Sequence, residues 1–281
     1  MKGILLACLG VLILTPDALL IRVSDLSAAP LVAWRGLAMG SLFLIAAVLS
    51  GQVRQTPRLI SGVGITLICA QWANASLFAP AISLAPVALV LIAIATVPIW
   101  AALLSWWLYS QPTSRATWIA IAIVGLGIGI ATSGKGEMSF TSTSLLGVAC
   151  GFGVALSLAL SFTLLRNNPD VPMLSAVGIG ALFAGGSAFA LATPTAMLSG
   201  NTWAIALASV VVLPVSFFLM STASRLTASV NVSLILLLET VLGPIWVWVF
   251  IDEAPTARMV VGGTIVVTTL ALYLWHLRRN S

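Results

Sequence analysis

The stretch from Ser83 to Trp107, SLAPVALVLIAIATVPIWAALLSWW, holds 25 residues and no charged side chain. The hydrocarbon core of a bilayer is about 30 Å thick, and a helix needs roughly 20 apolar residues to cross it. Because lipid offers the backbone no hydrogen-bond partner, an apolar run of this length has to be helical. Pro98 interrupts the run, which a helix in a membrane bundle tolerates better than a helix in water. The stretch therefore predicts a membrane-spanning helix.

Two motifs around this stretch return in the second half of the chain. Pro-Ile-Trp at 98–100 recurs at 244–246, which is 146 residues later, and Pro-Thr-x-Arg at 112–115 recurs at 255–258, which is 143 residues later. The two spacings differ by three residues, and one short insertion or deletion explains that difference. Both spacings are close to half of the 281-residue chain. The sequence therefore predicts an internal duplication.

The composition excludes a soluble domain. Hydrophobic residues make up 60% of the chain and charged residues only 7%, whereas about 25% of a typical soluble domain is charged. The mean hydropathy of +1.14 agrees. The net charge of +5 comes from basic residues scattered between apolar runs. They form no basic face of the kind that binds nucleic acid, so we expect no nucleic-acid partner.

The apolar runs predict an all-α polytopic membrane protein with ten spans. These are residues 3–21, 29–50, 59–80, 84–108, 115–133, 144–166, 173–192, 203–224, 229–250 and 256–275. The first run follows Lys2 as a signal peptide would, but nine further runs follow it, so we expect this span to be retained. The links are short, so the lipid bilayer is the main surrounding of the protein and no soluble domain is expected.

Lysine and arginine residues predict the orientation, because cytoplasmic loops are enriched in them. With the amino terminus in the cytoplasm, eight basic residues lie on the cytoplasmic side and three lie on the other side. The eight are Lys2, Arg54, Arg58, Arg115, Arg166, Arg225, Arg278 and Arg279, and the three are Arg22, Lys135 and Arg258. Both termini are therefore predicted to be cytoplasmic.

The duplication and the topology together predict an inverted repeat. The two copies, 1–135 and 144–277, each hold five spans, and an odd number of spans forces the second copy to enter the membrane the other way up. Inverted repeats are typical of secondary transporters, whose substrate site lies near the midplane between the halves. Rocking of one half against the other then exposes the site to each side in turn.

Three charged residues fall within the predicted spans: Asp17, Arg35 and Glu239. A charge at the bilayer centre costs about 2.5–3.5 kcal/mol on insertion scales, so such residues usually face a cavity or a partner. Asp17 and Arg35 lie toward the outer ends of the first two spans, where they could anchor the helices or form a structural pair. Glu239 lies in mid-span. It could hold helices together through hydrogen bonds, or it could contact a substrate amine or carry protons.

Other candidates for the substrate site share helix faces. Gln71, Asn74 and Phe78 are spaced i, i+3 and i+7, so they lie on one face of the third span. They could contact an amphipathic small molecule or form hydrogen bonds between helices. Ser157 belongs to a stripe of small residues in the sixth span, which more often indicates close helix packing. Phe162 lies beside this stripe and could cover a cavity.

The duplicated prolines are candidate hinges. A proline inside a helix frees a carbonyl one turn earlier, so Pro98 and Pro244 could each mark a hinge or an exposed polar backbone group. Trp100 and Trp246 follow these prolines at membrane depth. Trp100 is a candidate for the central cavity, and packing against lipid is the alternative for both tryptophans.

No pattern indicates enzymatic chemistry. GIATSGKG at 129–136 lacks the final hydroxyl residue of a phosphate-binding loop and has no soluble strand or helix beside it. His276 is the only histidine, which excludes a zinc-protease motif. Cys8, Cys69 and Cys150 all lie in apolar runs and suggest no metal site or disulfide. We therefore expect no enzyme activity, no cofactor and no metal.

The ten spans, the five-plus-five duplication and the DEAPT segment at 252–256 resemble the EamA type of the drug/metabolite transporter superfamily. Members typically carry a proline late in the fourth and ninth spans, then an acidic residue, a short turn and a last span that contains glycine. Pro98, Pro244 and Glu253 match this pattern. The first copy departs from it, because Ser-Gln stands at 110–111 where the second copy has Asp-Glu.

Within this superfamily the chain is similar to the YddG-like exporters of aromatic amino acids. The resemblance implies export of tryptophan, phenylalanine or tyrosine, and of other neutral amino acids, across a bacterial inner membrane. It also implies a central cavity lined by Asn74, Phe78, Trp100 and Phe162. We expect the protein to work as a monomer on a small-molecule substrate. The alternatives are export of drugs or other metabolites and channel-like facilitation.

Overall fold

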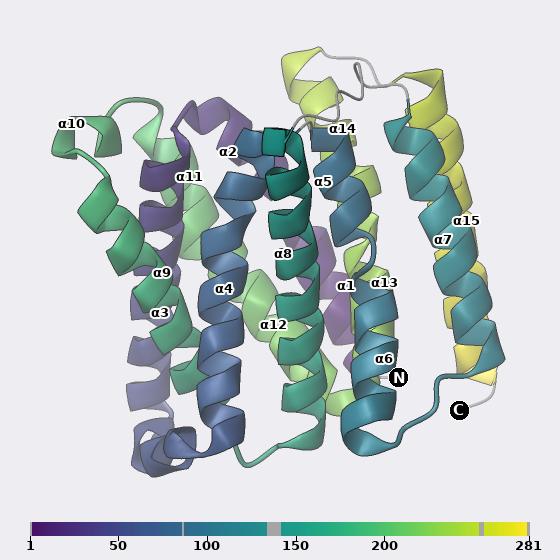
Figure 1. The fold of residues 1–281 in the computed structure, drawn as a ribbon, viewed down its shortest axis with the longest axis horizontal. Helices are drawn as coiled ribbons and strands as arrows, with labels where there is room; N and C mark the ends of the chain where they lie inside the picture. Colours follow the sequence, from purple (N-terminus) through teal and green to yellow (C-terminus); the bar gives the residue numbers. More distant parts are fainter. Residues whose placement is uncertain (1, 86, 134–141, 253–255, 280–281) are drawn as a thin grey trace.

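The structure is a computed structural model that describes residues 2–85, 87–133, 142–252 and 256–279 (Figure 1). The described residues are helical, without a β-strand. They form ten helical units that are long and apolar enough to cross a membrane, which confirms the predicted number of spans.

Six spans are single helices, and the other four are built from two or three helical segments. The single-helix spans are α3 (Ala28–Leu49), α4 (Gly62–Leu84), α7 (Arg115–Thr132), α8 (Ser142–Asn167), α9 (Met173–Leu191) and α15 (Ala257–Arg279). The first span consists of α1 (Lys2–Leu14) and α2 (Asp17–Ser24), and the fourth consists of α5 (Val87–Ile94) and α6 (Val97–Tyr109). The eighth span consists of α11 (Thr202–Leu207), the π-helix η2 (Ala208–Val212) and α12 (Leu213–Leu226). The ninth span consists of α13 (Ser229–Leu236) and α14 (Leu238–Ile251).

The third span begins later than the sequence predicts. The segment that links it to the second span is the 3₁₀-helix η1 (Gln52–Ile60), not a loop that ends at residue 58. Ser61 then caps α4, because its Oγ accepts a hydrogen bond from the backbone N–H of Gly64 at 3.1 Å. A second short helix, α10 (Pro194–Met197), lies outside the spans between α9 and α11.

Prolines lie close to three of the four interruptions. Pro16 separates α1 from α2, and Pro98 is the second residue of α6, directly after the break at 95–96. Pro214 follows the π-helix η2 of the eighth span. The break in the ninth span lies at Leu237, whereas Pro244 lies inside the continuous helix α14. The two predicted hinge prolines therefore have different surroundings, since only Pro98 adjoins a helix break.

The closest helix pairs join the two halves of the chain. Helix α1 packs along α12, α3 along α9, α4 along α8, and α7 along α15. Figure 1 shows α3 and α9 at one edge of the bundle and α7 with α15 at the other. Helix α6 also packs on α13 and α8. The halves are thus interleaved, and no boundary separates them as two bundles.

Glycine sets the distance at two of these crossings. A Cβ atom added to Gly36 of α3 would lie 2.6 Å from the Cα of Gly185 of α9. A Cβ atom added to Gly262 of α15 would lie 2.2 Å from the carbonyl oxygen of Gly127 of α7. Real Cβ atoms essentially never come this close to a neighbour. Small residues that let backbones approach are typical of membrane helix interfaces, where dispersion contacts replace the hydrophobic effect.

The α7–α15 crossing offers a matched test. We expect Gly127→Leu to destabilise the fold by about 1–3 kcal/mol, because the new side chain overlaps the backbone of α15. Gly125→Leu on the same helix is the control, since nothing lies within 4 Å of a Cβ atom at Gly125. Thermal unfolding of the two purified variants in one detergent measures the difference. Equal melting temperatures would show that this crossing does not limit stability.

Candidate functional site

A cavity of about 650 Å³ lies inside the bundle, between helices of both halves. Leu14 and Leu158 line it near the middle of their spans, and Arg22 and Thr256 line it near one end of the bundle. That end is opposite the chain termini, which lie at the bottom of Figure 1. Most of the lining side chains are apolar, so the few polar groups in the wall decide what the cavity binds.

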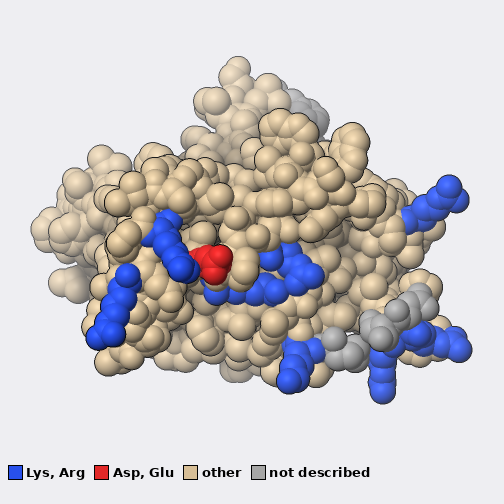
Figure 2. All heavy atoms as spheres, turned by 90° about the horizontal axis from the view of Figure 1, so that it is seen from below, with Lys and Arg blue, Asp and Glu red and all other residues tan. Residues whose placement is uncertain are grey.

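The end of the bundle that carries the termini is basic. Figure 2 looks at this end and shows lysine and arginine side chains spread over it, with a single acidic patch. Among the described residues, the eight basic residues on this end are Lys2, Arg54, Arg58, Arg115, Arg166, Arg225, Arg278 and Arg279. The opposite end carries Arg22 and Arg258. Lys135 and Glu253 lie outside the described residues, as do Gly134 to Gly136 of the phosphate-loop pattern.

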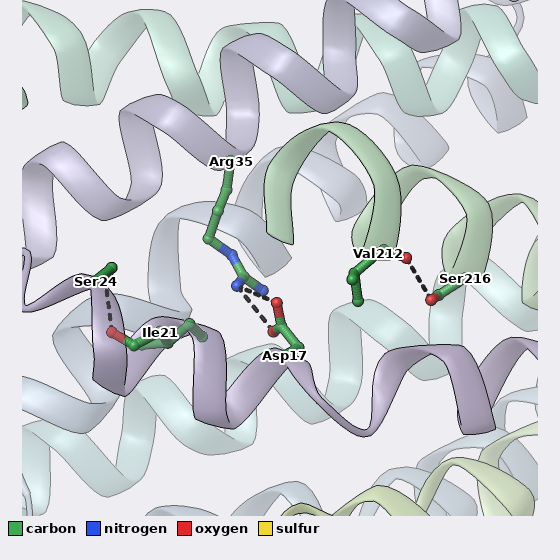
Figure 3. Close-up of polar contacts among 6 residues, drawn as sticks. All are labelled: Asp17, Ile21, Ser24, Arg35, Val212 and Ser216. Carbon is green, nitrogen blue, oxygen red and sulfur yellow. Dashed lines mark hydrogen bonds and ion pairs between the residues drawn. The ribbon is translucent and has the colours of Figure 1, made fainter. Parts of the chain in front are cut away.

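An ion pair stands in the wall of the cavity. The Nη1 atom of Arg35 donates hydrogen bonds to both carboxylate oxygens of Asp17, at 2.9 and 2.8 Å (Figure 3). The Asp17 side chain is only 4% exposed and that of Arg35 is 18% exposed. The guanidinium carbon of Arg35 lies 5.8 Å from the centre of the Phe78 ring, within reach of a cation–π interaction. Asp17 and Arg35 therefore form an ion pair, and both residues line the cavity.

The break at Pro16 explains how Asp17 reaches this place. Pro16 lacks a backbone N–H, so α1 ends before it and α2 starts anew at Asp17. A carboxylate in the first turn of a helix is favoured by the helix dipole. Thr15, at the break, satisfies its own hydroxyl by donating to the carbonyl of Leu12 at 2.8 Å.

Glu239, in the second half of the chain, lines the same cavity. It belongs to the first turn of α14, directly after the break at Leu237, and it is half-buried and lines the cavity. Among the residues that the structure describes, Glu239 forms no hydrogen bond or salt bridge. Asp17 and Arg35 are the charged groups that influence it electrostatically. The cavity thus holds a paired carboxylate and an unpaired one.

The structure brings together some of the predicted site residues and leaves others apart. Gln71, Asn74, Phe78, Glu239 and Pro244 all line the cavity. Ser157, Phe162, Trp100 and Pro98 do not belong to its lining. Phe162 is 2% exposed and packs in the apolar core, and Trp100 packs against the same core.

Sequence reasoning did not assign Arg35, Phe217 or Thr240 to the site, although all three line the cavity. For Arg35 a signal existed, because the sequence places an opposite charge at similar depth in the neighbouring span. For Phe217 and Thr240 no such signal exists, since apolar and hydroxyl residues are common in every span.

Hydrogen bonds between spans close the bundle at the end that carries the termini. Two buried sets connect helices of both halves. One set joins Ser105, Thr163 and Ser229, with 3.1 Å between the hydroxyl oxygens, and the other joins Thr117, Tyr273 and Asn231, at 2.9 and 2.8 Å. They link α6, α8 and α13 in the first case, and α7, α15 and α13 in the second. A molecule in the cavity is therefore separated from this end by packed, hydrogen-bonded helices.

The two duplicated tryptophans differ in their hydrogen bonding. The Nε1 of Trp246 donates to the hydroxyl of Thr15 at 2.9 Å. The Nε1 of Trp100 is buried and has no hydrogen-bond partner among the described residues. The hydroxyl of Ser161 is likewise buried without a partner among them. Ser161 follows Thr15 by 146 residues, which is the spacing that separates Trp100 from Trp246. The hydrogen bond of Trp246 to Thr15 therefore has no counterpart at Trp100.

Known proteins agree with this architecture. Residues 1–133 match the sequence model of the EamA-like transporter family. A solved crystal structure superimposes on 99% of this chain and 98% of its own, with a TM-score of 0.82 at 16% sequence identity, which shows a shared fold. The comparison with curated proteins finds no match. The first half of the chain is therefore similar to the EamA-like transporter family, and its ten apolar spans make the chain a multi-pass membrane protein.

Proposed function

We propose that the chain is a secondary transporter that exports aromatic and other neutral amino acids, or similar amphipathic metabolites, across a bacterial inner membrane. The observation that carries the proposal is the cavity between the halves, whose wall is mostly apolar but contains Asp17, Arg35 and Glu239. Such a wall suits a small molecule with an apolar ring and charged groups at one end. We further propose that it works as a monomer and by alternating access.

The helix packing supports an inverted repeat of residues 1–135 and 144–277. In such a repeat, spans 1–5 correspond to spans 6–10. Exchanging the two copies therefore converts the pair of spans 1 and 8 into the pair of spans 6 and 3. Both of these pairs are close contacts, α1 with α12 and α8 with α4. The same exchange leaves the pairs α3–α9 and α7–α15 unchanged, and these are the two glycine crossings. A twofold axis in the membrane plane would produce this set of pairs.

The basic end of the bundle supports a cytoplasmic position for both termini, because lysine and arginine collect on that side of a membrane. The cavity then reaches toward the outside of the cell, and the two buried hydrogen-bonded sets close it toward the cytoplasm. Export requires the opposite state as well, in which these bonds open and the outer end closes.

Two other functions remain to be tested against this one. The apolar lining also suits an apolar drug or another metabolite, and the unpaired Glu239 would suit a cationic one. A channel-like facilitator would need a continuous path, whereas packed helices close one end of this cavity. Saturable flux distinguishes a carrier from such a facilitator.

Transport by the purified protein tests the proposal. In proteoliposomes, with and without a pH gradient, we expect saturable uptake of radiolabelled tryptophan and phenylalanine. Phe78→Ala should raise the KM about ten-fold, because it removes an aromatic contact worth roughly 1.4 kcal/mol or more. The control is Phe189→Ala, whose side chain is 53% exposed on the outside of α9.

The transport measurement can fail in two informative ways. Uptake of a cationic drug without uptake of either amino acid would replace the proposed substrate class. Flux that does not saturate would favour the facilitator.

The unequal tryptophans provide a test of alternating access. If the two halves exchange conformations in the opposite state, Trp100 donates a hydrogen bond to Ser161 there and Trp246 loses its hydrogen bond to Thr15. Thr15→Val should then disfavour the present outward-facing state, and Ser161→Ala should favour it. Each lost hydrogen bond is worth about 1 kcal/mol, so each variant should shift the ratio of the states about five-fold, in opposite directions.

An accessible cysteine reports this ratio. Ala75→Cys lines the cavity and can be introduced after Cys8, Cys69 and Cys150 are replaced by alanine. The rate at which an impermeant thiol reagent labels it from outside intact cells should fall in Thr15→Val and rise in Ser161→Ala. If the labelling rate changed in the same direction in both variants, the proposed exchange of hydrogen bonds between the two states would be contradicted.

A further inference from the structure

Arg35 has hydrogen-bonding capacity that the protein does not use. A guanidinium carries five N–H donors, and both bonds to Asp17 start from Nη1. The Nη2 and Nε atoms therefore keep three donors, and these make no hydrogen bond with the described residues. Since Arg35 lines the cavity and is partly exposed in it, these donors are available to a molecule inside.

Glu239 has the complementary capacity. Its carboxylate lines the same cavity and lacks a hydrogen bond or salt bridge from the described residues. Asp17 and Arg35 pair with each other, so Glu239 is the carboxyl group in this wall without a protein partner among the described residues. A carboxylate in this position attracts a protonated amine. Arg22 also lines the cavity, near its outer end.

We infer that the cavity is a two-pole site for a molecule that carries both a carboxylate and a protonated amine. Arg35 receives the carboxylate through its free donors, and Glu239 receives the amine. This inference rests on the proposed function and deepens it, because it names the groups that recognise an amino acid. The poles come from different halves, α3 and α14, so one bound molecule bridges the two halves.

The apolar part of the molecule has a defined place in this arrangement. The Phe78 ring lies beside the Arg35 guanidinium, and Phe217, Met39 and Leu158 line the same cavity. A volume of about 650 Å³ lies within the range of small-molecule sites. A side chain with a ring can therefore occupy the apolar wall while the charged end lies between the poles.

Desolvation gives this arrangement a mechanical consequence. In the open cavity, water satisfies the free donors of Arg35 and the carboxylate of Glu239. Closing the outer end removes that water and leaves both groups unpaired at membrane depth, which is costly. A zwitterion supplies an acceptor to one pole and a donor to the other, so closure is favoured when an amino acid is bound.

Three ligands separate the two poles: L-phenylalanine, 2-phenylethylamine, which lacks the carboxylate, and 3-phenylpropionate, which lacks the amine. Their affinities for the full-length protein in nanodiscs can be measured by calorimetry. Glu239→Gln should weaken L-phenylalanine and 2-phenylethylamine about 30-fold or more, since the removed contact is a desolvated charge pair, and should not weaken 3-phenylpropionate. Arg35→Lys should weaken L-phenylalanine and 3-phenylpropionate but not 2-phenylethylamine, because lysine keeps the charge and loses the planar fork.

Matched controls lie outside the cavity lining. Asp252→Asn, at the end of α14, and Arg258→Lys, at the start of α15, should leave all three affinities unchanged. If Arg35→Lys does not fold, the double variant Asp17→Asn with Arg35→Gln removes both charges of the pair and should show the same ligand pattern.

The outcomes distinguish this inference from the proposed function. If the unaltered protein transports L-phenylalanine but the variants weaken all three ligands alike, the two-pole site is wrong and the proposed function stands. If the unaltered protein neither binds nor transports any of the three, both are overturned.

Discussion

The cost of an unpaired polar group in hydrocarbon governs this molecule. Lipid supplies no hydrogen bonds, so each backbone must be helical and each buried side chain needs a partner or water. The pair of Asp17 and Arg35 meets this requirement deep in the wall of the cavity. The buried sets around Ser229 and Tyr273 meet it at the closed end. Glu239 has no such partner among the described residues, and it lines the cavity, where the proposed substrate supplies one.

Close glycine crossings make some helix pairs rigid, whereas breaks in other spans allow movement. The crossings at Gly36–Gly185 and Gly127–Gly262 bring backbones into direct contact, so they leave little freedom to slide. Four of the spans that line the cavity differ from the spans at these crossings, because the first, fourth, eighth and ninth spans are broken into segments. Freed backbone groups and short segments permit bending at those points. Movement between outward and inward states is therefore expected in the broken spans, between glycine crossings that stay intact.

The sequence predicted the ten spans because span length depends on bilayer thickness, a constraint that acts on every residue in the run. It also placed Gln71, Asn74 and Phe78 on one face, and this face does line the cavity, since helical spacing alone fixes which residues share a face. It could not say toward which neighbour a face turns. Trp100 and Phe162 are near the right depth, but their helices turn them toward the core. The 3₁₀-helix Gln52–Ile60 was missed because it is short and polar on average.

A chain with two similar halves has to become asymmetric when it opens to one side. If both halves adopted the same conformation, the cavity would be equally open or closed at its two ends. Here Trp246 has a hydrogen bond to Thr15, while Trp100 and Ser161 are buried without one. Buried donors and acceptors without partners raise the energy of a state, whereas pairs at the equivalent positions lower it. In the proposed inward-facing state the two halves exchange these arrangements, so we expect the two states to have similar energies. A bound molecule that bridges Arg35 and Glu239 then needs only a modest difference in affinity to drive the protein from one state to the other.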